Sequence, residues 1–383
     1  MKKNPKLVVV MAVMLFLFLW VSSAKAAEPV AIKIIDCGGD LSSTQKIIEN
    51  YKAANPDKVK SVSFLKAPAP EVPTKIKVQQ DAKTVEINLI LTGQDAASVL
   101  VERGQLIKLF PDYQKKFPMD QFTDIAKILM KEGEGYCMPC VVSYGGPLFI
   151  YNPSKIPSPP KTVDEFKAWV KANPGKFMYA RPANSGPGRS IMMGSPYFLG
   201  DKNPKEPIKG WDKAWAFMKE IGQYIEYYPT GTTITMKEFA GGARWIIAGI
   251  MEWELRPRAV GMIPMESKIF ILPNTTFIID GHYWCIPKGV SEREKEVILD
   301  MMAFLLTPKQ QAFTYEGFIG PVVKNTNIDL APKDIQDLYK SVWRPEYEEI
   351  LKKHAHAPAL SAKLLVSAMD KWDQEVGAKK VKK

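Results

Sequence analysis

The sequence contains little histidine and cysteine, with three and four residues respectively among 383. His282 stands alone, and His354 and His356 lie in an alanine-rich stretch near the C-terminus. The sequence has neither a G-x-S-x-G nucleophile elbow nor an H-E-x-x-H zinc motif. These absences argue against a hydrolase and against bound zinc. We therefore expect no enzymatic activity, no metal and no cofactor.

A dense run of basic and aromatic residues is also missing. The formal net charge is +11 at pH 7, but the lysines are dispersed along the chain. Several of them lie in two terminal segments, the first 25 residues and the closing "KKVKK". Nucleic-acid binding usually needs a clustered basic patch or stripe. The sequence thus gives no support for a nucleic-acid partner.

The first 26 residues have the pattern of a secretory signal peptide. Three lysines precede an uncharged run from Leu7 to Val21, and small residues stand at Ala24 and Ala26. About 15 apolar residues are fewer than the roughly 20 that span a bilayer. We expect cleavage after Ala26 and a periplasmic protein. Removing the four lysines of this segment lowers the net charge from +11 to +7.

The four cysteines of an exported chain allow three disulfide connectivities if all of them pair. Cys137 and Cys140 form a "CMPC" motif, but its flanks look like a strand, whereas a thioredoxin-like motif starts a helix. Cys37 and Cys285 are far away in the sequence. We interpret the cysteines as structural, with a bridge to Cys285 as one option.

Strand and helix patterns alternate from the start of the mature chain. Strands are predicted at 30–36, 61–67 and 84–93, with helices at 42–56 and 94–104 between and after them. Ser42 or Ser43 is the expected cap of the first helix. This order predicts a parallel sheet with helices on both faces. Ligands of such sheets bind beyond the carboxyl ends of the strands, so Asp40 and Gln94 are candidate binding residues.

A second set of patterns starts after residue 150. A helix is expected from the Thr162 cap, followed by a strand at 176–182 and by another helix that opens at "NSGPGRS". Because the mature chain exceeds the ~250 to 300 residues at which single cores divide, two lobes are expected. The chain would cross between them near 141–150 and 277–287.

Several segments together resemble a known family. They are 104–109, 136–156, 162–169, 235–243 and 285–325. In their order and spacing they are similar to the extracellular solute-binding proteins of ABC importers, in the branch of polyamine, thiamine and iron(III) binders. The resemblance implies two lobes that close on one small solute, a membrane permease as partner, and a monomer. It implies a periplasmic-binding-protein fold in which each lobe is a mostly parallel sheet with flanking helices, joined by a two-strand hinge.

These expectations divide the chain into five parts. They are a signal peptide at 1–26, the first part of lobe 1 at 27–143, lobe 2 at 144–280, a return to lobe 1 at 281–330, and C-terminal helices with a basic tail at 331–383.

Two segments of the second lobe are candidate solute sites with opposite preferences. Asn184, Ser185 and Arg189 stand at an expected helix start, which attracts anions, and Arg181 precedes them as a candidate clamp for a carboxylate or phosphate. Trp253 and Glu254 lie in "EWE" after an apolar run, where an aromatic face and negative charge favour a cation.

The expected crossovers carry the remaining candidates. Tyr144 stands beside two glycines at the first crossover. His282 and Trp284 are two positions apart in the second crossover, so their side chains are expected on the same face of the strand, toward the cleft. Anions, polyamine-like or thiamine-like cations and sugars or polyols all remain open as solutes. A ligand-sensing partner of a membrane receptor would have the same fold, and a secreted enzyme is the weaker alternative.

Overall fold

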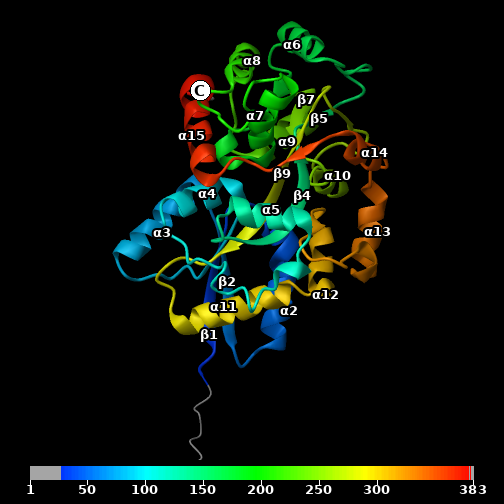
Figure 1. The fold of residues 1–383 in the computed structure, drawn as a ribbon. Coiled ribbons are helices and arrows are strands. Elements are labelled where there is room, and N and C mark those ends of the chain that lie inside the picture. The colour runs from blue at the N-terminus through cyan, green and yellow to red at the C-terminus, as the bar shows by residue number, and fades with distance from the viewer. Residues whose placement is uncertain (1–26, 379, 381–383) are drawn as a thin grey trace, which may run out of the picture.

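The computed structural model describes residues 27–378 and residue 380, so the expected signal peptide lies outside the described part. Two β-sheets form the centre of the molecule, each flanked by helices (Figure 1). The larger sheet has the strand order β10-β4-β9-β3-β1-β2, with β11 beside β9, and the smaller has the order β6-β7-β5-β8. We call the part built on the larger sheet the first lobe and the part built on the smaller sheet the second lobe.

The strands of the first lobe are β1 (Val30–Asp36), β2 (Val59–Lys66), β3 (Leu89–Thr92), β4 (Met138–Gly146), β9 (Phe277–Cys285), β10 (Gly320–Pro321) and β11 (His356–Ala357). Those of the second lobe are β5 (Leu148–Tyr151), β6 (Phe177–Met178), β7 (Ile246–Gly249) and β8 (Lys268–Phe270).

The helices follow the same division. Those around the larger sheet are α2 (Leu41–Ala54), α3 (Val72–Asp81), α4 (Gln94–Glu102), α5 (Asp124–Glu132), α11 (Glu292–Leu305) and α12 (Pro308–Gln311). Those around the smaller sheet are α6 (Val163–Ala172), α7 (Gly186–Phe198), α8 (Asp212–Gly222), α9 (Thr232–Ala240) and α10 (Leu255–Ala259). The chain ends with α13 (Lys333–Val342), α14 (Glu346–Lys353) and α15 (Ala362–Trp372).

The first three strands form the expected parallel core. β1 pairs in parallel with both β2 and β3, and its Ile32, Ile34 and Ile35 are buried. Helix α2 covers this core with Ile47 and Ile48. The cap of α2 differs from the prediction, because neither Ser42 nor Ser43 caps it. Instead, the carboxylate that ends β1 accepts hydrogen bonds from the backbone N–H groups of the turn that leads into the helix.

Both sheets are mixed, which corrects the expectation of mostly parallel lobes. In the larger sheet β9 runs antiparallel to β3 and β4, and in the smaller sheet β5 runs antiparallel to β7 and β8. The reason is the path of the chain. Strand β4 leads out of the first lobe and β9 leads back into it, so the two neighbours must run in opposite directions.

The β4–β9 pair is the connection between the lobes. Its register runs from Met138 opposite Trp284 to Gly146 opposite Ile278, with irregular pairing on either side of Ser143. Gly145 has a φ of +83°, and a Cβ atom there would lie 1.6 Å from the carbonyl oxygen of Ile278. Only glycine therefore fits at this position near the end of β4.

The C-terminal helices pack against both lobes. Helix α15 buries Leu365 and Trp372 in the core of the second lobe, and the Trp372 indole donates a hydrogen bond to the Tyr179 hydroxyl at 3.2 Å. The same helix contacts α4 of the first lobe, as Figure 1 shows. Helix α13 lies on the other side of the molecule, against α10.

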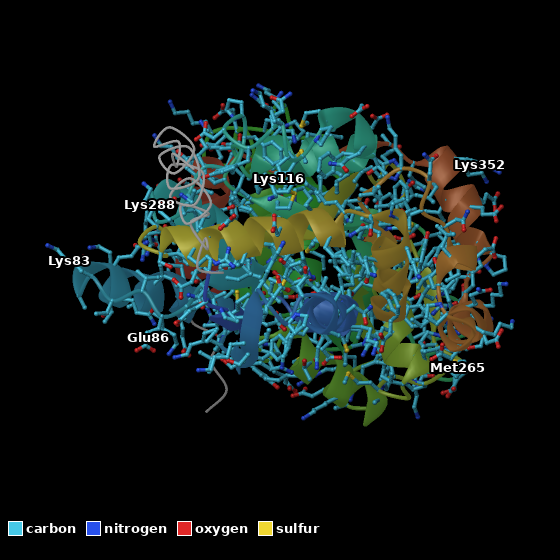
Figure 2. All side chains as sticks on the ribbon, turned by 90° about the horizontal axis from the view of Figure 1, so that it is seen from below. Lys83, Glu86, Lys116, Met265, Lys288 and Lys352 are labelled. Atoms are coloured by element: carbon cyan, nitrogen blue, oxygen red, sulfur yellow. The ribbon has the colours of Figure 1, made fainter. Side chains whose placement is uncertain are left out.

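The surface lysines are distributed around the molecule. Figure 2 shows Lys83 beyond the end of α3, Lys352 on α14, and Lys116 and Lys288 at separate places between them. None of the described helices is long and apolar enough to cross a membrane.

Candidate functional site

A cleft opens between the two lobes. Its outer part has a volume of about 770 Å³ and its inner part about 90 Å³. Five residues line both parts, which makes them one continuous space: Cys37, Gly38, Asn184, Thr232 and Trp253. The first two belong to the first lobe and the others to the second. A molecule in the cleft would therefore touch both lobes at once.

Arg189 lies at the floor of the cleft and links the lobes. Its Nη1 is 2.5 Å from Oδ2 of Asp95 at the start of α4, and its Nη2 is 3.6 Å from Oδ2 of Asp280 in β9. Only 3 % of the Arg189 side chain is exposed. Burial by itself would lower the pKa of Arg189, but the two carboxylates raise it above its ordinary value. Arg189 is thus a buried cation whose charge is balanced by both aspartates.

His282 lines the inner cleft, with Asp40 and Trp284 behind it. The His282 Nδ1 is 3.5 Å from Asp40 Oδ1, and the Trp284 indole donates to Asp40 Oδ2 at 3.0 Å. Burial lowers the pKa of His282, but the nearby Asp40 carboxylate raises it above the ordinary value. Asp40 and Trp284 are fully buried and lie outside the cleft. They orient the His282 ring and do not contact the solute space.

Two helices begin at the wall of the second lobe. Ser185 caps α7, since its Oγ accepts from the Gly188 N–H at 3.1 Å, and this Oγ lies 2.8 Å from Oγ1 of Thr232 at the start of α9. The N–H groups of a helix's first turn have no partner within the helix, and the positive end of the helix dipole points the same way. Because Pro187 has no N–H and Ser185 binds that of Gly188, the wall of donors consists of the Gly186 N–H of α7 and the first N–H groups of α9.

Trp253 supplies the apolar surface of the cleft. It follows β7 through Glu252, whose φ of +65° turns the chain sharply. The ring is partly exposed and borders both the inner and the outer cleft. A flat ring at this position offers a stacking face next to the helix N-termini.

The first lobe contributes a wall of different character. Asp36 accepts hydrogen bonds from the N–H groups of Gly38, Gly39 and Asp40 at 3.1, 2.9 and 3.0 Å, so this carboxylate is already satisfied. Burial raises the pKa of Asp36. Lys46 and Lys66 also line the outer cleft, and neither forms an ion pair within residues 27–378.

Two predicted binding residues form ion pairs elsewhere. The Arg181 guanidinium donates to Asp373 Oδ1 at 2.5 Å and to the Gly377 carbonyl at 3.0 Å, beyond α15. Glu254 is fully buried, and its carboxylate accepts from Arg344 Nε at 2.6 Å and from the Tyr347 hydroxyl. Neither side chain lines the cleft, because the C-terminal helices supply these partners.

Two further predicted residues also lie outside the cleft. The Gln94 amide donates to Glu132 Oε2 at 2.7 Å and to the Ile279 carbonyl at 3.2 Å, behind the sheet. The Tyr144 ring packs edge-on against His356, with 5.4 Å between the ring centroids. Of the eleven predicted side chains, the cleft is lined by five: Asn184, Ser185, Arg189, Trp253 and His282.

Some lining residues were not among the predicted set. Asp95 directly follows Gln94, so its position just after the carboxyl end of a strand could have identified it as a lining residue. Asp280 stands two residues before His282 and has the same parity on β9. No local pattern indicates Thr232, because its position beside Ser185 depends on how α9 packs against α7.

A cleft between two lobes, with groups from both at its walls, is the arrangement of a two-lobed binding protein. The model of the family of bacterial extracellular solute-binding proteins matches residues 46–338. The chain belongs to this family. It is an exported protein and the solute-binding component of an ABC transporter.

Solved structures of low sequence identity share the fold. A putative spermidine/putrescine ABC transporter from Listeria monocytogenes has a TM-score of 0.64 at 16 % identity, covering 90 % of this chain and 98 % of that one. The periplasmic binding protein AfuA from Actinobacillus pleuropneumoniae, with fructose-6-phosphate bound, has 0.63 at 15 % identity, covering 90 % and 98 %. An ABC transporter from Clostridium perfringens has 0.63 at 13 % identity, covering 92 % and 100 %. No curated protein sequence matches the chain significantly.

Proposed function

We propose that this protein captures a small anionic solute in the cleft by closure of the two lobes and delivers it to the permease of an ABC importer. It acts as a monomer and catalyses no reaction. One observation carries the proposal. The buried acidic groups of the cleft have partners inside the protein, whereas several of its hydrogen-bond donors and cations have none among the described residues.

The carboxylates that are buried or largely buried in the cleft already have partners. Asp36 accepts three backbone N–H groups, Asp95 is paired with Arg189, and Asp280 faces the same guanidinium. A cationic solute would have to displace one of these partners. The buried acidic side chains of the cleft are thus poor candidates for a cation site.

The remaining groups include donors and cations, and the outer cleft also has the exposed Glu49 and the partly exposed Glu316. The donors are the Gly186 N–H of α7 and the first N–H groups of α9 on one wall, and the cations are the ammonium groups of Lys46 and Lys66 on the other. Together they favour a carboxylate or phosphate. Trp253 beside them favours a solute that also carries a ring, such as a sugar phosphate or a cyclic carboxylic acid.

A thermal-shift screen of residues 27–383, after partial unfolding and refolding to remove any bound solute, tests this proposal. The panel contains sugar phosphates, small carboxylates, phosphate, neutral sugars, polyamines and thiamine. A solute at about 100 times its Kd adds roughly 2.7 kcal/mol to the unfolding free energy. We expect a shift with one anionic class only.

Variants then locate the site. Replacing Ser185 by Ala together with Thr232 by Val should weaken anion binding at least tenfold, because both hydroxyls border the donor wall. Ser195→Ala is the matched control, since its hydroxyl donates to the Met192 carbonyl within the same helix. Shifts with polyamines alone would overturn the anionic class but keep the receptor function, and silence across the panel would count against capture of any of these solutes.

A further inference from the structure

Two cysteines face each other across the strands that connect the lobes. Met138 pairs with Trp284 in the antiparallel β4–β9 ladder, so the preceding residue on one strand, Cys137, lies opposite the following residue on the other, Cys285. Both thiols are fully buried. Burial raises the pKa of Cys285, and the adjacent Cys137 side chain raises it further.

The other two cysteines have different neighbours. The Cys37 thiol donates to the Leu91 carbonyl at 3.4 Å, and the Cys140 thiol lies 3.5 Å from both carboxylate oxygens of Asp40. Cys37 directly follows β1, and Cys140 is the third residue of β4. Neither is placed opposite another cysteine by the strand register.

The "CMPC" motif does not bring its own cysteines together. Cys137 precedes β4 by one residue and Cys140 lies within it. Extended chain advances about 3.3 Å per residue, so Cα atoms three positions apart are separated by roughly 10 Å. A disulfide needs Cα atoms within about 7 Å. The sequence left the partner of Cys285 open, and the strand register points to Cys137.

We infer that Cys137 and Cys285 form a disulfide in the exported protein, while Cys37 and Cys140 remain thiols. The oxidant is a protein disulfide of the dithiol-oxidase class. Each cysteine loses its thiol proton, one S–S bond forms, and the two electrons reduce the donor's disulfide to a dithiol. Because both thiols are buried in the folded protein, the exchange takes place while the chain folds after export.

This bond would fix the base of the connection between the lobes. It lies at the first-lobe end of β4 and β9, before the irregular pairing at 139–141 and far from that at 143–146. Closing the covalent loop from 137 to 285 encloses all four strands of the second lobe. When the lobes move, the two strands would then bend on the second-lobe side of the bond, and their first-lobe ends would stay paired.

Thiol counting on the protein secreted into an oxidising periplasm tests the inference. The chain is unfolded in guanidinium chloride with N-ethylmaleimide and no reductant, and the modified cysteines are counted by mass spectrometry. Two should be modified without reductant and four after reduction. The unreduced peptide map should contain one cross-link, between the peptides of Cys137 and Cys285. Modification of all four without reductant, or a cross-link through Cys37 or Cys140, would overturn the inference.

Single serine variants separate the pair from the other thiols. Cys37→Ser should keep the cross-link and leave one modified cysteine, whereas Cys285→Ser should lose the cross-link and leave three. Reductant should lower the Tm of the unmodified protein by roughly 5 °C and leave that of the Cys137→Ser/Cys285→Ser protein unchanged. Equal Tm losses in both proteins would contradict a stabilising bond. These results do not depend on which solute binds.

Discussion

The Arg189 guanidinium lies 2.5 Å from the Asp95 carboxylate, and this ion pair joins the second lobe to the first at the floor of the cleft. Two further contacts accompany it. The Asn184 side-chain oxygen accepts from the Ala69 N–H at 3.0 Å, and Arg256 donates to the Glu316 carbonyl at 2.6 Å. The lobes are thus in direct contact around the cleft, and opening it requires these three contacts to break.

Replacing Arg189 by Met should destabilise the protein and weaken solute binding. The change leaves Asp95 and Asp280 buried without their cation, which costs about 3 to 5 kcal/mol for a broken buried pair. Urea unfolding and calorimetric titration measure the two effects. Arg181→Met is the matched control, since its pair with the half-exposed Asp373 is worth less than about 1 kcal/mol. Equal losses in the two variants would contradict a special role for Arg189.

Replacing Trp253 by Ala should lower solute affinity by roughly 10- to 100-fold, because a ring with a stacking face is worth about 1 to 3 kcal/mol. Trp253→Phe should recover part of the loss. Trp245→Ala serves for comparison, since the Trp245 ring is partly exposed in the second lobe and faces Lys176. Tryptophan fluorescence and calorimetry report binding. An unchanged affinity in Trp253→Ala would remove the ring from the site.

Replacing Glu254 by Gln should change stability without changing affinity. The buried Glu254 carboxylate accepts from Arg344 at 2.6 and 3.1 Å, so the amide leaves this buried guanidinium with only the exposed Glu346 carboxylate, 3.6 Å away, as counter-charge. We expect a loss of about 3 kcal/mol in the free energy of unfolding. Calorimetric titration of the Glu254→Gln variant, well below its Tm, should give the same solute affinity as that of the unmodified protein. If the solute binds much more weakly to this variant, Glu254 contributes to the binding site.

Glu252 should make stability depend on pH. Burial raises its pKa from 4.5 to about 8, and it forms neither an ion pair nor a side-chain hydrogen bond within residues 27–378. Between these pH values the folded protein holds a proton that the unfolded chain has lost. The free energy of unfolding therefore falls as pH rises from about 4.5 to 8.

Glu252→Gln should reduce the pH dependence of the free energy of unfolding. At pH 8 the variant should be more stable than the unmodified protein by on the order of 1 kcal/mol or more, as the size of the pKa shift implies. Part of the slope should persist, because burial also raises the pKa of Glu132 to about 8. Urea unfolding at several pH values between 5 and 9 gives the slope. A variant that keeps the full slope would show that Glu252 is ionised in the folded protein.

Where a local sequence pattern agrees with the structure, it depends only on residues close together in the chain. Ser185 caps α7 because a hydroxyl before a glycine-rich turn satisfies the first free N–H groups, and this depends on neighbouring residues alone. Alternation put His282 and Trp284 on one face of β9, and both contact Asp40. It could not tell that Trp284, two residues deeper in the first lobe, lies in the core.

The residues that local patterns misplaced have partners far away in the sequence. Arg181 and Glu254 looked like an anion clamp and a cation ligand, but they pair with Asp373 and Arg344, 192 and 90 residues further on. A charged side chain after a strand can face a ligand or another part of the protein. Which of these happens depends on where the C-terminal helices pack.

The sequence by itself determined the alternating strands and helices, the division into two lobes and the glycine at the connection, because hydrophobic periodicity, caps and backbone sterics act over a few residues. Only the tertiary structure decided which polar groups of the cleft remain available. That choice depends on charges such as Asp95 and Arg189, 94 residues apart, meeting in a buried space. The free energy of such a pair is the difference between the attraction of the two buried charges and the cost of removing them from water, and no local pattern encodes either quantity.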